Sequence, residues 1–157
     1  MTVLGIDPGT AQIGYGVIKH ERNRISCLAY GTIGDKNLDP LTNLVTAEAE
    51  LSKLIERYKP DTAGVEKLFF FKNQKTVMAV SEMRGVILFT LARHRVPVQQ
   101  FTPLQVKQNI SSYGKAGKDQ VQRMVKLLLN LEEPVKPDDA ADALAIAICC
   151  SHNIIPV

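Results

Sequence analysis

The sequence lacks the usual signs of a membrane-bound or exported protein. No apolar run approaches the roughly 20 residues that a membrane-spanning helix needs. Met1-Thr2 leads straight into "VLGID", without the basic stretch followed by an apolar one that marks a signal peptide. The three cysteines, Cys27, Cys149 and Cys150, form no metal-ligand spacing and include one adjacent pair, as is typical of reduced thiols. We therefore expect a cytoplasmic protein without membrane contact, whose cysteines serve as packing residues.

Internal repeats, low-complexity segments and long linkers are also missing. The chain has 157 residues, of which 45% are hydrophobic and 22% are charged, and this suits one globular domain with its own core. Its three histidines, His20, His94 and His152, are scattered and suggest neither a metal ligand nor a catalytic base. We expect a single domain over residues 1–157.

The basic residues concentrate in the middle of the chain. Residues 67–126 hold 11 Lys and Arg against 2 Asp and Glu, whereas residues 1–66 hold 7 against 9 and residues 127–157 hold 1 against 5. Such a block is either an ordinary solvated surface or the electrostatic footprint of a polyanion such as nucleic acid. The charge distribution by itself leaves both interpretations open.

Hydrophobic periodicity and turn residues predict five strands and five helices. Strands are expected at residues 2–7, 13–20, 25–33, 62–66 and 96–101. Helices are expected from Pro40, after Asp39 as N-cap, to the Lys59-Pro60 break, at 74–93 after Asn73, from 103 onward, at 119–130 and after Pro137. Three strands followed by alternating helices and strands predict an α/β fold, a five-stranded mixed sheet flanked by helices.

Four acidic residues are expected at one edge of this sheet. Asp7 ends the first strand and Glu66 ends the fourth, while Asp139 and Asp142 share one face in the first turn of the last helix. Capping explains Asp139 taken alone, and we expect Asp138 to be the cap or its neighbour without a chemical role. Converging acids repel one another unless cations bind, and carboxylate oxygens suit Mg²⁺ or Mn²⁺. Two such ions about 4 Å apart activate water in phosphodiester hydrolysis.

Four motifs, "LGIDPGTAQIGYGVI", "VEKLFFFKN", "QVKQNI" and "DAADALAIAI", occur in this order over residues 2–151. Together they resemble the RuvC-type Holliday-junction resolvases of the RNase H-like superfamily. The resemblance implies the sheet order 3-2-1-4-5 and a homodimeric, metal-dependent endonuclease that resolves four-way DNA junctions by paired symmetric nicks in recombination and repair. It implies a RuvA–RuvB branch-migration complex as a partner. It also implies that Asp7, Glu66, Asp139 and Asp142 are catalytic and hold two Mg²⁺ ions, or Mn²⁺, although some relatives have histidine in place of Asp139.

The resemblance and the basic block together suggest DNA-binding residues. Phe69 matches an aromatic residue that stacks at the junction centre in the family, although three consecutive phenylalanines are also typical of a core. Lys107 and Lys118 match its DNA-binding lysines. Lys115 lies with Lys118 in a glycine-containing loop before a helix, which suits either phosphate contact or a solvated surface. The DNA-binding candidates are Phe69, Lys72, Asn73, Lys107, Lys115 and Lys118.

Two further patterns each leave two interpretations. The helix expected at 74–93 is apolar on more than one face, including Met78 and Met83, which suits a two-fold helix pairing between two copies or a second buried side within one. Gly14 and Gly16 lie on one strand face, where they allow backbone or substrate to approach closely or mark a bulge.

Three other functions compete with junction resolution. An RNase H-like enzyme acting on RNA or a hybrid would share the acids and the basic block. The segment "IDPGT" before a glycine-rich strand resembles the phosphate loop of actin-like and sugar-kinase-like ATP-binding folds, which are usually much longer than this chain. A junction-binding module without catalysis would gain affinity by losing negative charge near phosphate, so four intact acids argue against it.

Overall fold

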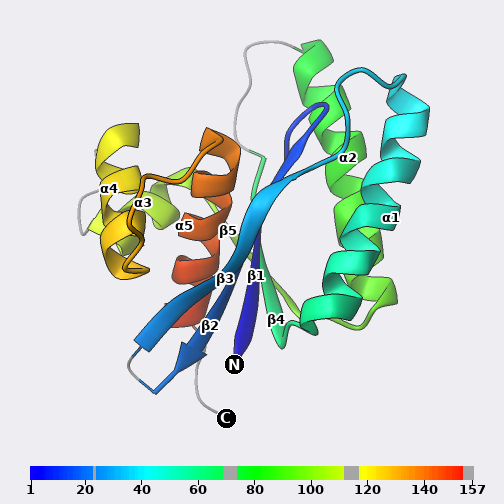
Figure 1. Ribbon diagram of the computed structural model, residues 1–157. Coiled ribbons are helices and arrows are strands. Elements are labelled where there is room, and N and C mark those ends of the chain that lie inside the picture. Colours follow the sequence, from blue (N-terminus) through cyan, green and yellow to red (C-terminus); the bar gives the residue numbers. More distant parts are fainter. Residues whose placement is uncertain (23, 69–73, 112–116, 154–157) are drawn as a thin grey trace.

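The residues that the structure describes, 1–22, 24–68, 74–111 and 117–153 of a computed structural model, form one five-stranded mixed sheet (Figure 1). Its strands are β1 (Thr2–Asp7), β2 (Ile13–Glu21), β3 (Arg24–Ile33), β4 (Thr62–Glu66) and β5 (Val98–Phe101). They lie in the order β3-β2-β1-β4-β5, with the first three antiparallel and β1, β4 and β5 parallel. The expected fold class and order are confirmed. β5 begins two residues later than predicted, because Pro97 has no N–H to join the ladder.

Helices cover both faces of the sheet (Figure 1). α1 (Pro40–Tyr58) and α2 (Gln74–Arg93) lie on one face, and α3 (Pro103–Ser111), α4 (Lys118–Leu128) and α5 (Asp138–His152) lie on the other. α1 begins where predicted, because the side chain of Asp39 accepts a hydrogen bond from the backbone N–H of Thr42 at 3.1 Å. α4 ends two residues earlier than predicted, and Asn130 beyond it has a positive φ of 50°. Within the described ranges, no helix is both long enough and apolar enough to cross a membrane.

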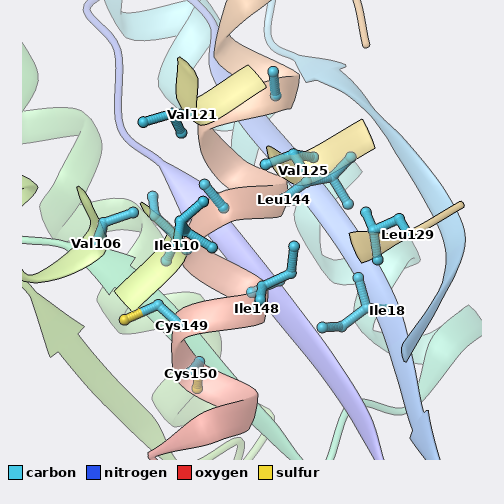
Figure 2. Close-up of a cluster of buried hydrophobic side chains, with 14 of the residues drawn as sticks. Ile18, Val106, Ile110, Val121, Val125, Leu129, Leu144, Ile148, Cys149 and Cys150 are labelled. Atoms are coloured by element: carbon cyan, nitrogen blue, oxygen red, sulfur yellow. The ribbon is translucent and has the colours of Figure 1, made fainter. Parts of the chain in front are cut away.

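An apolar layer lies on each side of the sheet. Leu4 and Ile6 of β1 pack on the side of α1 and α2, whereas Val3 packs with α5, as the alternation of side chains along a strand requires. Figure 2 shows the layer around α5, where Leu144 and Ile148 lie among side chains of α3, α4 and β2, namely Val106, Ile110, Val121, Val125 and Ile18. Cys149 and Cys150 are fully buried in this layer, which agrees with a packing role.

α5 approaches the sheet closely because glycines lie beneath it. Gly5 of β1 pairs with Gly16 of β2 and with Gly64 of β4, so this glycine row removes the side chains of three neighbouring strands at one point. A Cβ at Gly5 would lie 2.0 Å from the carbonyl oxygen of Ala143 in α5. The structure therefore supports the close-approach interpretation of Gly14 and Gly16, and the register shift in β2 lies further along the strand.

Candidate active site

Three carboxylates meet at the carboxyl end of β1. Asp7 is the last residue of β1, and Asp139 and Asp142 project from the beginning of α5. One oxygen from each lies within 4.8 Å of the others. Gly14 of β2, the strand partner of Asp7, permits this convergence, because a Cβ there would lie 2.0 Å from the carbonyl oxygen of Asp139. Three converging carboxylates are a donor set that fits a hard divalent cation such as Mg²⁺ or Mn²⁺.

Asp142 lies further into α5 than the sequence indicated. The helix begins at Asp138 after Pro137, which is its N-cap in an extended conformation, so the acids of the first turn are Asp138 and Asp139. The prediction that Asp139 and Asp142 both occupy the first turn is therefore wrong for Asp142. The unpaired N–H groups of the helix start do not reach Asp142, and its charge needs another source of compensation.

Glu66 lies beside Asp7, and both carboxyl groups have raised pKa values. Burial and then the charges of Glu66, Asp142 and Asp139 raise the pKa of Asp7 from 3.8 to about 8. Burial and then the charge of Asp142 raise the pKa of Glu66 to about 7, although its hydrogen bond with Asp7 and the charge of Lys107 oppose the rise. Without a cation both groups therefore ionise less readily than ordinary carboxyls, and a cation bound there would favour their ionised forms.

Lys118 provides the compensation for Asp142. Its ammonium nitrogen lies 3.0 Å from Asp138 Oδ2 and 3.7 Å from Asp142 Oδ2. Burial raises the pKa of Asp142, and the charge of Lys118 lowers it. The side chain of Gln122 also donates a hydrogen bond to Asp138 at 2.9 Å. Asp138, for which no chemical role was expected from the sequence, thus holds the ammonium group of Lys118 in the position where it faces Asp142.

A pocket of about 190 Å³ opens beside the acids, between β4 and the three helices α3, α4 and α5. Lys107 of α3 and Lys118 of α4 line it together with Glu66 and Asp142. Its apolar lining comes from Pro103, Val106, Val121, Ala145 and Ile146. Two of the lysines that the sequence suggested for DNA contact therefore lie next to the acidic cluster.

Several other predicted site residues lie outside the described residues. These are Phe69, Lys72, Asn73 and Lys115. Their roles stay predictions, as does the choice of the aromatic residue that faces the junction among the three consecutive phenylalanines.

α2 presents an exposed apolar face to solvent. Met78 is 66% exposed and Phe89 is 61% exposed, while a Cβ added at Gly85 between them would meet nothing within 4 Å. Met83, in contrast, is buried against the chain's own sheet. The apolar residues of α2 thus lie partly in the core of the chain and partly on a surface open to solvent.

One polar contact of the site was not anticipated from the sequence. The Nε of Arg84 on α2 donates a hydrogen bond to the backbone oxygen of Glu66 at 3.4 Å, and its guanidinium group also donates to the side chain of Gln100 on β5. In the sequence Arg84 was one of 11 cations in the basic block. The helix also carries Lys75, Glu82 and Arg93, so its pattern gave no signal that sets Arg84 apart.

Comparisons with known proteins identify relatives of the whole fold. The T. thermophilus RuvC structure is 30% identical, with a TM-score of 0.88 over 96% of this chain and 93% of that one. A second structure, T. thermophilus RuvC in complex with Holliday junction substrate, is 31% identical with a TM-score of 0.91 over the same shares. Both similarities extend over the strands and helices that carry the acids.

Sequence comparison gives the same answer at higher identity. The crossover junction endodeoxyribonuclease RuvC of Caldanaerobacter subterraneus subsp. tengcongensis is 48% identical over 154 residues, which are 98% of this chain and 93% of the relative. The family model described as crossover junction endodeoxyribonuclease RuvC matches residues 3–150. The chain belongs to the RuvC family of crossover junction endodeoxyribonucleases.

Proposed function

We propose that this chain resolves four-way DNA junctions by metal-dependent hydrolysis of one phosphodiester bond in each of two strands. The observation that carries the proposal is the convergence of Asp7, Asp139 and Asp142 within 4.8 Å, beside a pocket flanked by two lysines. The T. thermophilus relative bound to a Holliday junction supports the choice of substrate. The whole chain acts as one nuclease domain in the cytoplasm.

Asp7, Glu66, Asp139 and Asp142 are the residues that would hold two Mg²⁺ ions, with Mn²⁺ as a substitute. Bound there, the ions supply an activated water and charge stabilisation for the leaving oxygen. Water attacks the phosphorus in line, the bond to the 3′ oxygen breaks, and the products are a 5′-phosphate and a 3′-hydroxyl. The carboxyl groups must be ionised to hold the ions, so protons compete with the cations as the pH falls.

Lys107 and Lys118 bind phosphates next to the scissile bond. In the DNA-free protein Lys118 is paired with Asp138 and Asp142, and its side chain is still about half exposed. A phosphate that approaches can therefore share the ammonium group, and divalent cations would neutralise Asp142 in its place. Phe69, Lys72, Asn73 and Lys115 make further contacts to the junction in this proposal.

A homodimer places two active sites on one junction and accounts for symmetric nicks. The exposed face of α2, around Met78, Gly85 and Phe89, is the surface that a second copy would cover. Two identical faces can meet across a two-fold axis, which matches the symmetry of a four-way junction. A RuvA–RuvB branch-migration complex is the further partner.

The decisive test is cleavage of a synthetic four-way junction with an immobile core, in Mg²⁺ and in EDTA. A linear duplex and an RNA–DNA hybrid serve as competing substrates. Asp7→Asn should abolish metal-dependent nicks, while Glu56→Gln, which changes an exposed acid on α1, should retain them. Tight binding without cleavage in either Mg²⁺ or Mn²⁺ would indicate a junction-binding module. Preference for the hybrid would instead indicate an RNase H-like activity.

A further inference from the structure

The peptide unit that follows Glu66 is held at both of its polar atoms. Its carbonyl oxygen accepts the hydrogen bond from Arg84 Nε at 3.4 Å. Its N–H, which belongs to Lys67, donates to the backbone oxygen of Phe101 at 2.8 Å. β4 ends at this peptide unit, and the chain then leaves the sheet.

The sheet itself offers little support on the other side of this peptide unit. The neighbouring strand β1 ends at Asp7 and continues with Pro8, which has no N–H to extend the ladder. A side-chain donor from outside the sheet takes over at this edge. Arg84 fills that role from α2, and its second partner, Gln100 on β5, fixes the direction of the guanidinium group.

Glu66 is half-buried and lines the pocket together with Asp142, so the direction of its carboxyl group depends on the backbone that carries it. Removing a group that orients a metal ligand typically weakens metal binding by about 10–100-fold. Arg84 contacts the backbone of Glu66 and acts through that residue.

We propose that Arg84 is a positioning residue that holds the end of β4, and thereby the carboxylate of Glu66, in the geometry that the cation site requires. This inference rests on the proposed function for the identity of the site, and it adds a residue that lies on the opposite face of the sheet from α5. Because Arg84 projects from α2, it also links the helix with the exposed apolar face to the acidic cluster.

The test compares Arg84→Met and Arg84→Lys with Arg93→Met. Arg93 is a matched control, because it lies on the same helix and makes its own side-chain bonds, to Glu48 and Ser52 of α1, remote from the acids. Mn²⁺ binding to the DNA-free protein is measured by electron paramagnetic resonance, junction binding is measured in EDTA, and the Mg²⁺ dependence of kcat and KM is measured separately.

We expect Arg84→Met to weaken Mn²⁺ binding by about tenfold and to lower kcat, with junction affinity in EDTA within about twofold of wild type. Arg84→Lys should recover part of the Mn²⁺ affinity, and Arg93→Met should leave it unchanged. Wild-type Mn²⁺ affinity in Arg84→Met would overturn the proposal. Loss of junction affinity with unchanged metal dependence would do so as well, because it would mean that Arg84 contacts DNA.

Two provisions keep the test decisive. If Arg84→Met does not fold, Gln100→Ala removes the partner that directs the guanidinium group, and it should weaken Mn²⁺ binding in the same direction. Normal Mn²⁺ binding in that variant would overturn the proposal. Failure of the wild-type protein to cut junctions would contradict the proposed function. The role of Arg84 would still be decided by Mn²⁺ binding to the Arg84 variants, because that binding is measured without DNA.

Discussion

The acidic cluster should make the metal-free protein less stable as the pH rises, and Asp7→Asn should weaken this dependence. Burial and neighbouring carboxylates raise the pKa of Asp7 from 3.8 to about 8 and that of Glu66 from 4.5 to about 7. In the unfolded chain both groups are ionised above about pH 5. Between pH 5 and pH 7 Asp7 alone therefore holds about one proton more in the folded protein than in the unfolded chain, and Glu66 adds to this excess, so the free energy of unfolding falls with rising pH.

The size of the effect follows from that one proton. It changes the free energy of unfolding by about 1.4 kcal/mol per pH unit, so the loss between pH 5 and pH 7 is about 3 kcal/mol. For a chain of 157 residues this corresponds to about 5–10 °C in melting temperature. Asp7→Asn removes the contribution of Asp7, while Glu66 remains. The variant should therefore melt above the wild type at pH 7 in EDTA.

Differential scanning calorimetry of both proteins in EDTA, from pH 5 to pH 8, measures this difference. Burial and the nearby His20 lower the pKa of His152 from 6.5, which gives stability the opposite dependence at the acidic end. Both proteins carry this histidine, so the difference between them isolates the cluster. Saturating Mg²⁺ should flatten the wild-type profile and leave Asp7→Asn unaffected. A difference that stays constant from pH 5 to pH 7 would refute the reasoning.

Three other substitutions test the site and its surroundings. Gly14→Ala places a Cβ 2.0 Å from the carbonyl oxygen of Asp139, so it should destabilise the protein by about 1–3 kcal/mol and weaken Mn²⁺ binding. An unchanged melting curve would contradict the close approach of α5. Lys118→Met should change the melting temperature by no more than about 2 °C, because exposed ion pairs contribute little to stability. In a titration of junction binding from low to high salt, the same variant should lower the salt dependence by about one phosphate contact. Phe89→Glu should leave the monomer folded, because this side chain is exposed, while analytical ultracentrifugation should show loss of the dimer and cleavage assays should show unpaired nicks. A dimer that persists in this variant would mean that the interface lies on another surface.

The elements of the fold were predictable where local signals decide them. Asp39 and Pro40 start α1 through contacts within one turn of helix, and the strand that ends at Glu66 has a pattern readable from five residues. The order of the strands came from the family resemblance, because periodicity does not say which strands pair. The end of α4 was less predictable, since helix boundaries depend on the packing around them.

The candidate site was predictable as a set of acids and only partly as an arrangement. Asp7 and Glu66 stand at strand ends in the sequence, so their convergence could be anticipated. The ion pair between Lys118 and Asp138 joins residues 20 positions apart on two helices, and no periodicity encodes such a contact. The bond from Arg84 to the backbone of Glu66 likewise appears only when α2 is packed on the sheet.

The glycine row under α5 has a consequence for how this protein can vary. Backbone of the helix approaches backbone of β1 at Gly5, whereas the side chains of Leu144 and Ile146 lie over Gly16 and Gly64, so the depth of α5 is set by the absence of side chains on the three strands. Apolar residues elsewhere in the layer, such as those between α4 and α5, can therefore be exchanged for one another, in evolution or in a designed library, without a change in the spacing of the carboxylates. Cores tolerate such exchanges when total volume is kept. A thermostabilised variant should accordingly be sought by repacking α3 and α4, with the glycines left in place.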